Sequence, residues 1–145
     1  MTIVVVGDAG MDVLVRHTRP IEPGTDQPAG VRTAIGGAGA NLCVWLGADA
    51  ALVGRVGDDP AGRLVAAELA AAGVECVLTV DPDAGTCWVV VLVDEHGQRA
   101  MLSDRGAGRR LRAGDLPAAL LARARHLHLS GYVLLDPASR AAGRA

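Results

Sequence analysis

Near its start the chain carries a run of almost exclusively apolar, β-branched residues, TIVVV at positions 2–6, followed directly by Gly7 and Asp8. Because no polar residue alternates with the apolar ones, the run predicts a strand that is buried on both faces. Strands of this kind belong to parallel sheets that helices cover on both sides. The run therefore favours an α/β fold.

Later segments alternate between strand and helix in the same way. The pattern predicts helices at 38–46, 60–72 and 116–124, and further buried strands at 50–53, 74–80 and 126–130. Asp59 and Pro60 fit the N-cap and N1 positions of the second helix, Gly73 fits its C′ position, and Asp115 is expected to cap the third. This alternation predicts a mostly parallel, three-layer sheet of the Rossmann-like kind.

Four further β segments do not fit that simple alternation. The segments 86–94 and 99–103 flank the turn EHGQ and predict a β-hairpin. A short strand is expected at 13–15 and an edge strand at 31–35, separated by the segment 17–30, which is rich in Pro, Gly and Thr and predicts a loop. These segments are additions to the parallel sheet.

Composition excludes several functional classes. The chain of 145 residues fits one domain, and its net charge of −2, with two Trp, one Tyr and no Phe, argues against nucleic-acid binding. No apolar run reaches the ~18 residues that a membrane span needs, and the N-terminus lacks the pattern of a signal peptide. The three cysteines form no CxxC pair, so we expect core thiols in a reducing cytoplasm.

The segment IGGAGAN, residues 35–41, is a glycine-rich loop that would let a ligand approach the backbone closely. A phosphate-binding Walker A loop needs a lysine, and all fourteen basic residues of this chain are arginines. A dinucleotide fingerprint needs a third glycine and a place directly after the first strand, and this loop has neither. A polyol is the third candidate ligand.

Two side chains suit a polyol, because a carboxylate accepts from two hydroxyls and an amide both donates and accepts. Asp12 follows the first strand, at the carboxyl edge where ligands bind in open α/β sheets, and Asn41 ends the glycine loop. The residues alone leave an alternative open for each. Asn41 could serve only as a helix N-cap, and Asp12 only as a turn residue.

Several segments, taken in order, resemble the ribokinase-like (PfkB-type) carbohydrate kinases. They are GDAGMDVLV, IGGAGANLCVWLGAD, LVGRVGDDPAGRLVAAELAAAGVE, SDRGAGRRL and ARHLHLSGY, and they span nearly the whole chain. The resemblance is to the N-terminal half of that family. It implies that Asp12, Gly36, Gly37 and Asn41 bind a sugar, and that residues from about 12–35 and 86–103 form a β-lid over it.

The resemblance also implies phosphoryl transfer from ATP to a sugar hydroxyl with Mg²⁺, and a general-base Asp in a GAGD motif. Here Gly37-Ala38-Gly39 is followed by Ala40, and Gly106-Ala107-Gly108 by Arg109, so neither matches. Residues 1–145 are therefore expected to be the N-terminal part of a kinase domain, truncated before the ATP-binding half. We expect no catalytic residue, cofactor-binding residue or metal ligand in this chain.

Two departures from the family affect the expected sugar site. Family members often carry Asn two residues before the Asp that follows the first strand, where this chain has Gly10. The segment WLGADAALVG at 45–54 is also shorter than its counterpart by about one helical turn, which shortens the helix behind Asn41.

Three functions stay open from the sequence. The first is the sugar-binding half of a kinase. The second is an inactive fragment that binds a sugar, or that self-associates as a homodimer through the lid or through the exposed edge of its last strand. The third, a Rossmann-type oxidoreductase domain, is disfavoured by the glycine spacing. The expected partner is a small-molecule sugar, with no nucleic acid and no membrane.

Some other residues have less specific interpretations. His126 and His128 share one face of a strand, but a metal site would need a third ligand. Trp45 and Trp88 are expected in the core or in lid packing. A basic cluster follows the hairpin and predicts a solvated loop or, alternatively, a phosphate contact: Arg105, Arg109, Arg110 and Arg112.

Overall fold

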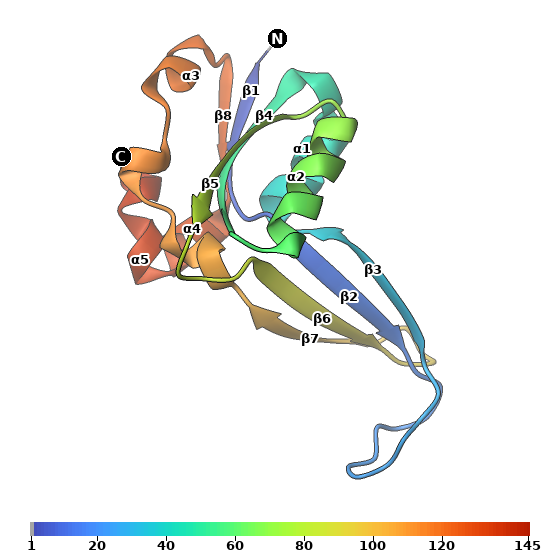
Figure 1. Ribbon diagram of the computed structural model, residues 1–145. Helices are drawn as coiled ribbons and strands as arrows, with labels where there is room; N and C mark the ends of the chain where they lie inside the picture. Colours follow the sequence, from blue (N-terminus) through green and yellow to red (C-terminus); the bar gives the residue numbers. More distant parts are fainter. Residues whose placement is uncertain (1) are drawn as a thin grey trace.

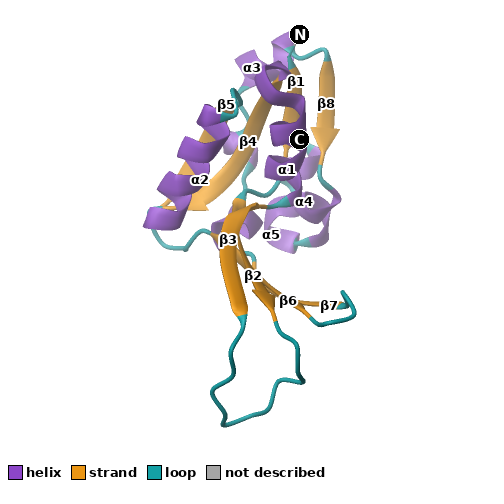
Figure 2. Cartoon of the chain, turned by 90° about the vertical axis from the view of Figure 1, so that its right-hand side faces the viewer, coloured by secondary structure: helices purple, strands orange, loops and turns teal. Residues whose placement is uncertain are grey.

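The computed structural model describes residues 2–145 and shows two sheets joined end to end, with helices packed on the first (Figures 1 and 2). The strands are β1 (Ile3–Val6), β2 (Gly10–Arg16), β3 (Gly30–Gly36), β4 (Ala50–Gly57), β5 (Glu75–Asp81), β6 (Cys87–Val93), β7 (Arg99–Asp104) and β8 (His126–Leu129). The α-helices are α1 (Ala38–Leu46), α2 (Pro60–Ala71), α3 (Ala118–Arg123), α4 (Gly131–Leu135) and α5 (Pro137–Arg140). Short 3₁₀ helices are η1 (Gly47–Asp49), η2 (Gly106–Arg110), η3 (Ala113–Asp115) and η4 (Ala142–Arg144).

The central sheet has the strand order β5-β4-β1-β8, and each neighbouring pair is parallel. Strand β1 lies between β4 and β8, and its residues Val4, Val5 and Val6 are at most 3% exposed. This burial confirms the prediction made from the TIVVV run. The last strand, β8, lies at an edge of the sheet, as the sequence predicted.

Two separate cores cover the faces of the central sheet. Val5 and Leu52 pack with α1 and α2 on one face, whereas Val4 and Val53 pack with residues of α3 and α4 on the other (Figure 1). Alternate residues of β1 thus point into different cores, as the two-residue period of a strand requires. The prediction of a mostly parallel, three-layer α/β fold is confirmed.

The second sheet has the order β3-β2-β6-β7 and projects away from the end of the central sheet (Figure 2). Strands β2 and β6 pair in parallel, while the two outer strands pair antiparallel to their neighbours. The hairpin of β6 and β7 and the edge position of β3 agree with the sequence. Strand β2 is longer than expected, because it begins at Gly10 and extends to Arg16.

Helix α2 begins and ends where its capping residues predicted. Asp59 Oδ1 accepts a hydrogen bond of 2.7 Å from the Gly62 amide, and Pro60 is the first helical residue. Gly73, directly after the C-cap, has φ of +82°, a conformation that glycine adopts without strain. Asp59 also accepts from the amide and the hydroxyl of Thr86, so the cap ties α2 to the start of β6.

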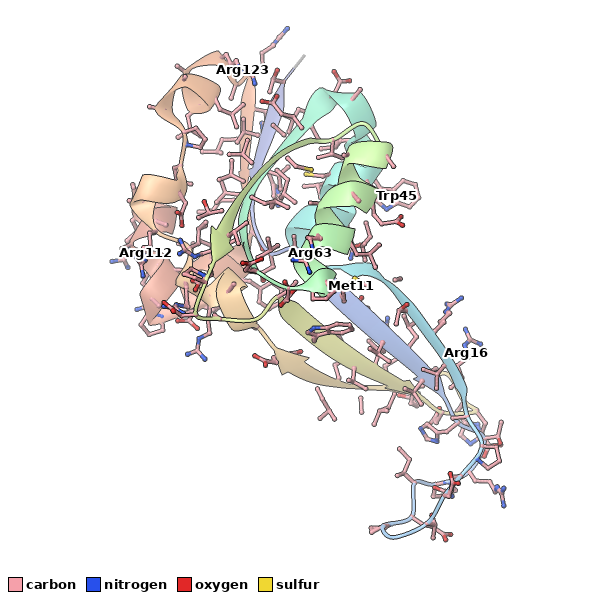
Figure 3. All side chains as sticks on the ribbon, in the orientation of Figure 1. Met11, Arg16, Trp45, Arg63, Arg112 and Arg123 are labelled. Carbon is pink, nitrogen blue, oxygen red and sulfur yellow. The ribbon has the colours of Figure 1, made fainter. Side chains whose placement is uncertain are left out.

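The predicted helix at 116–124 was wrong in its start and its cap. Helix α3 begins only at Ala118, because Pro117 precedes it as the N-cap. Asp115 instead ends the 3₁₀ helix η3, where its carboxylate accepts from the Arg112 amide and pairs with Arg55. The expectation that Trp45 packs in the core or the lid was also wrong: its side chain points away from α1 and is 89% exposed (Figure 3).

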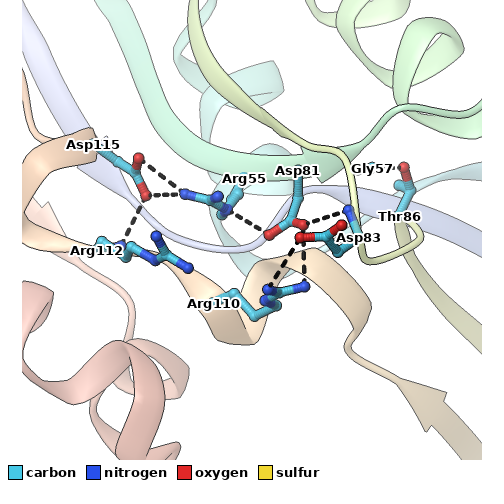
Figure 4. Close-up of polar contacts among 8 residues, drawn as sticks. All are labelled: Arg55, Gly57, Asp81, Asp83, Thr86, Arg110, Arg112 and Asp115. Atoms are coloured by element: carbon cyan, nitrogen blue, oxygen red, sulfur yellow. Dashed lines mark hydrogen bonds and ion pairs between the residues drawn. The ribbon is translucent and has the colours of Figure 1, made fainter.

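A buried ion-pair network joins the central sheet to η2 and η3 (Figure 4). Arg55 of β4 donates to Asp81 at 2.9 Å and to Asp115 at 2.8 Å, and Arg110 lies 3.1 Å from the other oxygen of Asp81. Burial alone would raise the pKa of Asp81, but hydrogen bonds from the Asp83 amide and Arg55, with the nearby arginine charges, lower it. The network fixes the segment that follows β7.

A search of the helices within residues 2–145 finds none whose length and apolarity would let it cross a lipid bilayer.

Candidate functional site

A cavity of about 300 Å³ lies where the second sheet joins the central one. Its lining comes from parts of the chain that are far apart in sequence: the β1–β2 connection, the glycine loop with the start of α1, strands β6 and β7, and the start of α4. It contains three of the four residues predicted to bind a sugar, Asp12, Gly37 and Asn41. The fourth, Gly36, lies beside it, against Asp12.

Asp12 lies on β2, paired with Ala34 of β3 and Val89 of β6. It is therefore a strand residue, and the alternative that it serves only as a turn residue is wrong. Its carboxylate is half-buried and has no hydrogen-bond partner among residues 2–145. Burial raises the pKa of Asp12 above its ordinary value of 3.8. The carboxylate is thus available to a ligand in the cavity.

The glycine loop packs tightly against the β1–β2 connection. A Cβ atom on Gly36 would overlap the Asp12 carboxylate, and one on Gly37 would lie 2.5 Å from the carbonyl oxygen of Asp8. Gly37 also has φ of +97°, which disfavours any residue with a side chain. The Ala40 amide donates to the same Asp8 carbonyl at 3.1 Å. The glycines therefore bring the backbone and Asp12 together.

Asn41 is the fourth residue of α1, and Gly37 occupies the N-cap position. The alternative that Asn41 caps this helix is therefore wrong. The Asn41 side chain is exposed at the cavity and makes no hydrogen bond within residues 2–145. Asp12 and Asn41 thus present a free carboxylate and a free amide to one space, from different elements.

Gly10, where family members often carry Asn, has no room for a side chain in this backbone. A Cβ atom there would overlap the carbonyl oxygen of Cys87, its partner across β2 and β6. Cys87 itself lines the cavity, and burial raises its pKa to about 11, so the thiol is protonated at neutral pH. Glycine at position 10 therefore allows β2 and β6 to pair this closely.

Sequence reasoning missed two charged or aromatic residues of the cavity, Asp8 and Tyr132. Nη2 of Arg105 donates to both carboxylate oxygens of Asp8, at 3.0 and 3.1 Å, and the guanidinium lies 5.5 Å from the centre of the Tyr132 ring. Arg105 Nε is buried and has no hydrogen-bond partner in the described part of the chain. Asp8 directly follows the first strand in the sequence, and this position could have identified it as a candidate site residue.

Two other arginines of the predicted basic cluster are held by partners outside the cavity. Arg109 lies 3.0 Å from Asp136, and Arg110 pairs with Asp81. Of the four, Arg105 alone lines the cavity. His126 and His128 are exposed on β8, and no group of three metal-ligating side chains occurs within residues 2–145.

Comparison with known proteins gives the family. The model for "pfkB family carbohydrate kinase" matches residues 1–144. A fructokinase from Klebsiella pneumoniae is 34% identical over 142 residues, which cover 94% of this chain and 42% of that protein. An ATP-dependent ribose-1-phosphate kinase from Halopiger xanaduensis is 32% identical over 131 residues, 86% of this chain and 44% of that protein.

Among solved structures, a fructokinase with bound ATP from Xylella fastidiosa superposes with a TM-score of 0.79 at 26% identity. The match covers 99% of this chain and 49% of that one. This chain therefore spans about half the length of the kinases that it matches. The ordered motifs, the three-layer fold and the family match over residues 1–144 agree, and the chain belongs to the pfkB family of carbohydrate kinases.

Proposed function

We propose that this chain forms the sugar-binding half of a carbohydrate kinase, which transfers the γ-phosphoryl group of ATP to a sugar hydroxyl. The observation that carries the proposal is the convergence of two polar side chains on one cavity of about 300 Å³: the Asp12 carboxylate and the Asn41 amide, neither of which has a hydrogen-bond partner within residues 2–145. One carboxylate can accept from two neighbouring hydroxyls, and the amide can donate to one and accept from another. A polyol satisfies both groups at once.

The second sheet would act as the lid of this site. Strands β2, β6 and β7 each contribute a cavity residue, Asp12, Val89 and Ser103 among them, so a movement of the sheet would change access to the sugar. Closure over a bound sugar would exclude water, which otherwise competes as the phosphoryl acceptor.

Three groups that could bind a nucleotide phosphate already have partners within residues 2–145. The Ala40 amide of the glycine loop donates to the Asp8 carbonyl, and Arg105 and Arg110 are each paired with a carboxylate, so no free anion site is formed by these groups. Asp115 follows Ala113 and Gly114 and so matches the last three residues of the GAGD motif, but it is paired with Arg55 and does not line the cavity. We infer that ATP, Mg²⁺ and the general base would be held by residues outside this chain.

An alternative function is a catalytically inactive chain that binds sugar or self-associates. It is favoured by the exposed apolar surface on both sheets. Leu127 of the edge strand β8 is 54% exposed, and Leu102 and Val31 on the outer strands of the second sheet are 63% and 65% exposed. Large exposed apolar side chains on edge strands promote association, including a homodimer through the lid.

The names of the relatives include both a neutral and a phosphorylated sugar as acceptor: one is a fructokinase and another a ribose-1-phosphate kinase. The family therefore leaves the sugar of this chain open. A cytoplasmic location stays a prediction of the sequence. The packing of the glycine loop against Asp8 gives no support to dinucleotide binding.

The proposal is tested by isothermal titration of the purified chain with D-fructose and D-ribose, beside the variant Asn41→Ala. Asn41 is exposed on a helix, so its truncation should leave the fold intact. Saturable binding that the variant weakens at least about tenfold, or ~1.4 kcal/mol, is expected. ADP formation tests the expected lack of catalysis by this chain alone: we expect none from ATP and sugar, and measurable sugar-dependent ADP formation would contradict it.

A further inference from the structure

We propose that the cavity selects uncharged sugars, and that Asp8 enforces this choice by pairing with the guanidinium of Arg105. The inference rests on the proposed sugar-binding function and extends it to the class of acceptor. It concerns sugars whose phosphate or carboxylate would have to enter this cavity.

Arg105 is the one cationic side chain that lines the cavity, as far as residues 2–145 form it. Its Nη2 donates to both oxygens of Asp8, and the Tyr132 ring lies 5.5 Å from its guanidinium carbon. Its Nε is buried and has no hydrogen-bond partner among the described residues. An incoming anion would therefore have to compete with Asp8 for the guanidinium.

Asp8 is well placed to keep Arg105 in this state. The Asp8 side chain is only 9% exposed, whereas that of Arg105 is 22% exposed. The Asp8 backbone is fixed as well, because its carbonyl accepts from the Ala40 amide at the start of α1. A partly buried carboxylate that has lost most of its water is stabilised by its arginine and would be costly to leave alone. The pair is thus a fixed part of the cavity wall.

The charge balance of the lining then disfavours an anion. Two carboxylates, Asp8 and Asp12, face one guanidinium, which leaves one negative charge in excess. Asp12 is half-buried, so its repulsion of a phosphate or carboxylate is screened less than it would be in bulk water. A neutral polyol meets no such repulsion and still satisfies Asp12 and Asn41.

The substitution Asp8→Asn should relax this selection. It removes one negative charge and weakens the hold on Arg105, so the guanidinium becomes free to pair with an anion. The ratio of affinities, anionic over neutral sugar, should rise at least about tenfold, which corresponds to ~1.4 kcal/mol. Asp58→Asn is the matched control: Asp58 is 71% exposed and pairs at 3.3 Å with Arg63 on the surface. Its ratio should equal that of the wild type.

The test uses two pairs of probes in calorimetric titrations of the whole chain: fructose with fructose 6-phosphate, and glucose with glucuronate. The wild type should bind the neutral member of a pair at least about tenfold more tightly. Raising the salt from about 0.01 M to about 0.15 M shortens the Debye length from ~30 to ~8 Å and should narrow this gap. Thermal unfolding establishes whether each variant is folded.

Equal or tighter binding of the anionic member by the wild type would overturn this inference and leave the proposed sugar site standing. A folded Asp8→Asn variant with an unchanged ratio would also overturn it. Failure of the wild type to bind any of the four probes would remove the proposed function and this inference with it. Should Asp8→Asn not fold, the salt dependence in the wild type decides.

Discussion

The carboxylate of Asp12 occupies the space that a Cβ atom on Gly36 would fill. The two residues belong to neighbouring strands, β2 and β3, and Gly36 is the last residue before the turn into α1. Glycine at position 36 therefore leaves the space in which the Asp12 carboxylate lies.

Gly36→Ala should therefore both weaken the fold and disturb sugar binding. The added methyl group would force Asp12 or the β2–β3 pairing to move, at a cost of about 1–3 kcal/mol. Gly30→Ala is the control, because it lies on the same strand and its Cβ would meet only the Arg16 Cβ atom, at 3.8 Å. Urea unfolding of both variants measures the difference. Equal stabilities would contradict the tight Asp12–Gly36 contact.

Asp12→Asn should weaken sugar binding without lowering the stability of the fold. Burial raises the pKa of Asp12, so the ionised carboxylate costs stability at neutral pH, and protonation as the pH falls relieves that cost. The neutral amide has the same shape, so the melting temperature of the variant should equal or exceed that of the wild type. Its affinity for fructose should fall at least about tenfold. Protonation removes the same negative charge as the substitution does, so wild-type binding should weaken as the pH falls through the raised pKa of Asp12. Binding by the variant within about twofold of the wild type would contradict the role of this carboxylate.

Asp81→Asn should be strongly destabilising, because it leaves Arg55 and Arg110 with less compensation at a nearly inaccessible site. Breaking a buried pair in this way costs about 3–5 kcal/mol. The pKa of Asp81 is lowered below 3.8, so its stabilising effect is complete above that pH and is lost as the pH falls through its folded-state pKa. Stability of the variant should therefore depend less on pH in that acidic range.

Asp83→Asn provides the comparison for Asp81→Asn. The Asp83 side chain is 76% exposed and lies 3.9 Å from Arg110, so its loss should change stability by less than about 0.5 kcal/mol. Urea unfolding at neutral and at acidic pH measures both effects. Similar losses in the two variants would show that burial of Asp81 does not set the strength of the network.

The sequence predicted best those features that depend on neighbouring residues. The bounds of α1, the Asp59 cap of α2 and the buried strand β1 all follow from local patterns, and the structure has them. Contacts between distant segments could not be predicted in this way. Asp8 and Arg105 are 97 residues apart, and only the fold brings them together.

Asp115 is a second example of a long-range contact that the sequence did not reveal. Its place before an apolar segment favoured a helix cap, but its carboxylate pairs with Arg55, 60 residues earlier in the chain. Trp45 was expected in the core or in lid packing, yet it lies on the solvent side of the short helix α1. Local chemistry does not reveal which face of a short helix meets the core.

The exposed apolar strands predict self-association of the chain. Sedimentation velocity should show species larger than a monomer that increase with concentration. Leu127→Lys, on the edge strand β8, and Leu102→Lys, on β7, then locate the contact: whichever substitution restores the monomer identifies the sheet involved. A monomer at all concentrations, with a sharp thermal transition, would contradict this prediction.

The most direct test of the account is a titration of the ¹⁵N-labelled chain with D-fructose, observed through the side-chain amide of Asn41. This amide lines the cavity and has no partner within residues 2–145, so a bound sugar should contact it. We expect a saturable shift of the Asn41 amide signals whose midpoint moves to at least about tenfold more fructose in Asp12→Asn. A sugar that binds without moving these signals, or an unchanged midpoint in Asp12→Asn, would contradict the proposed site.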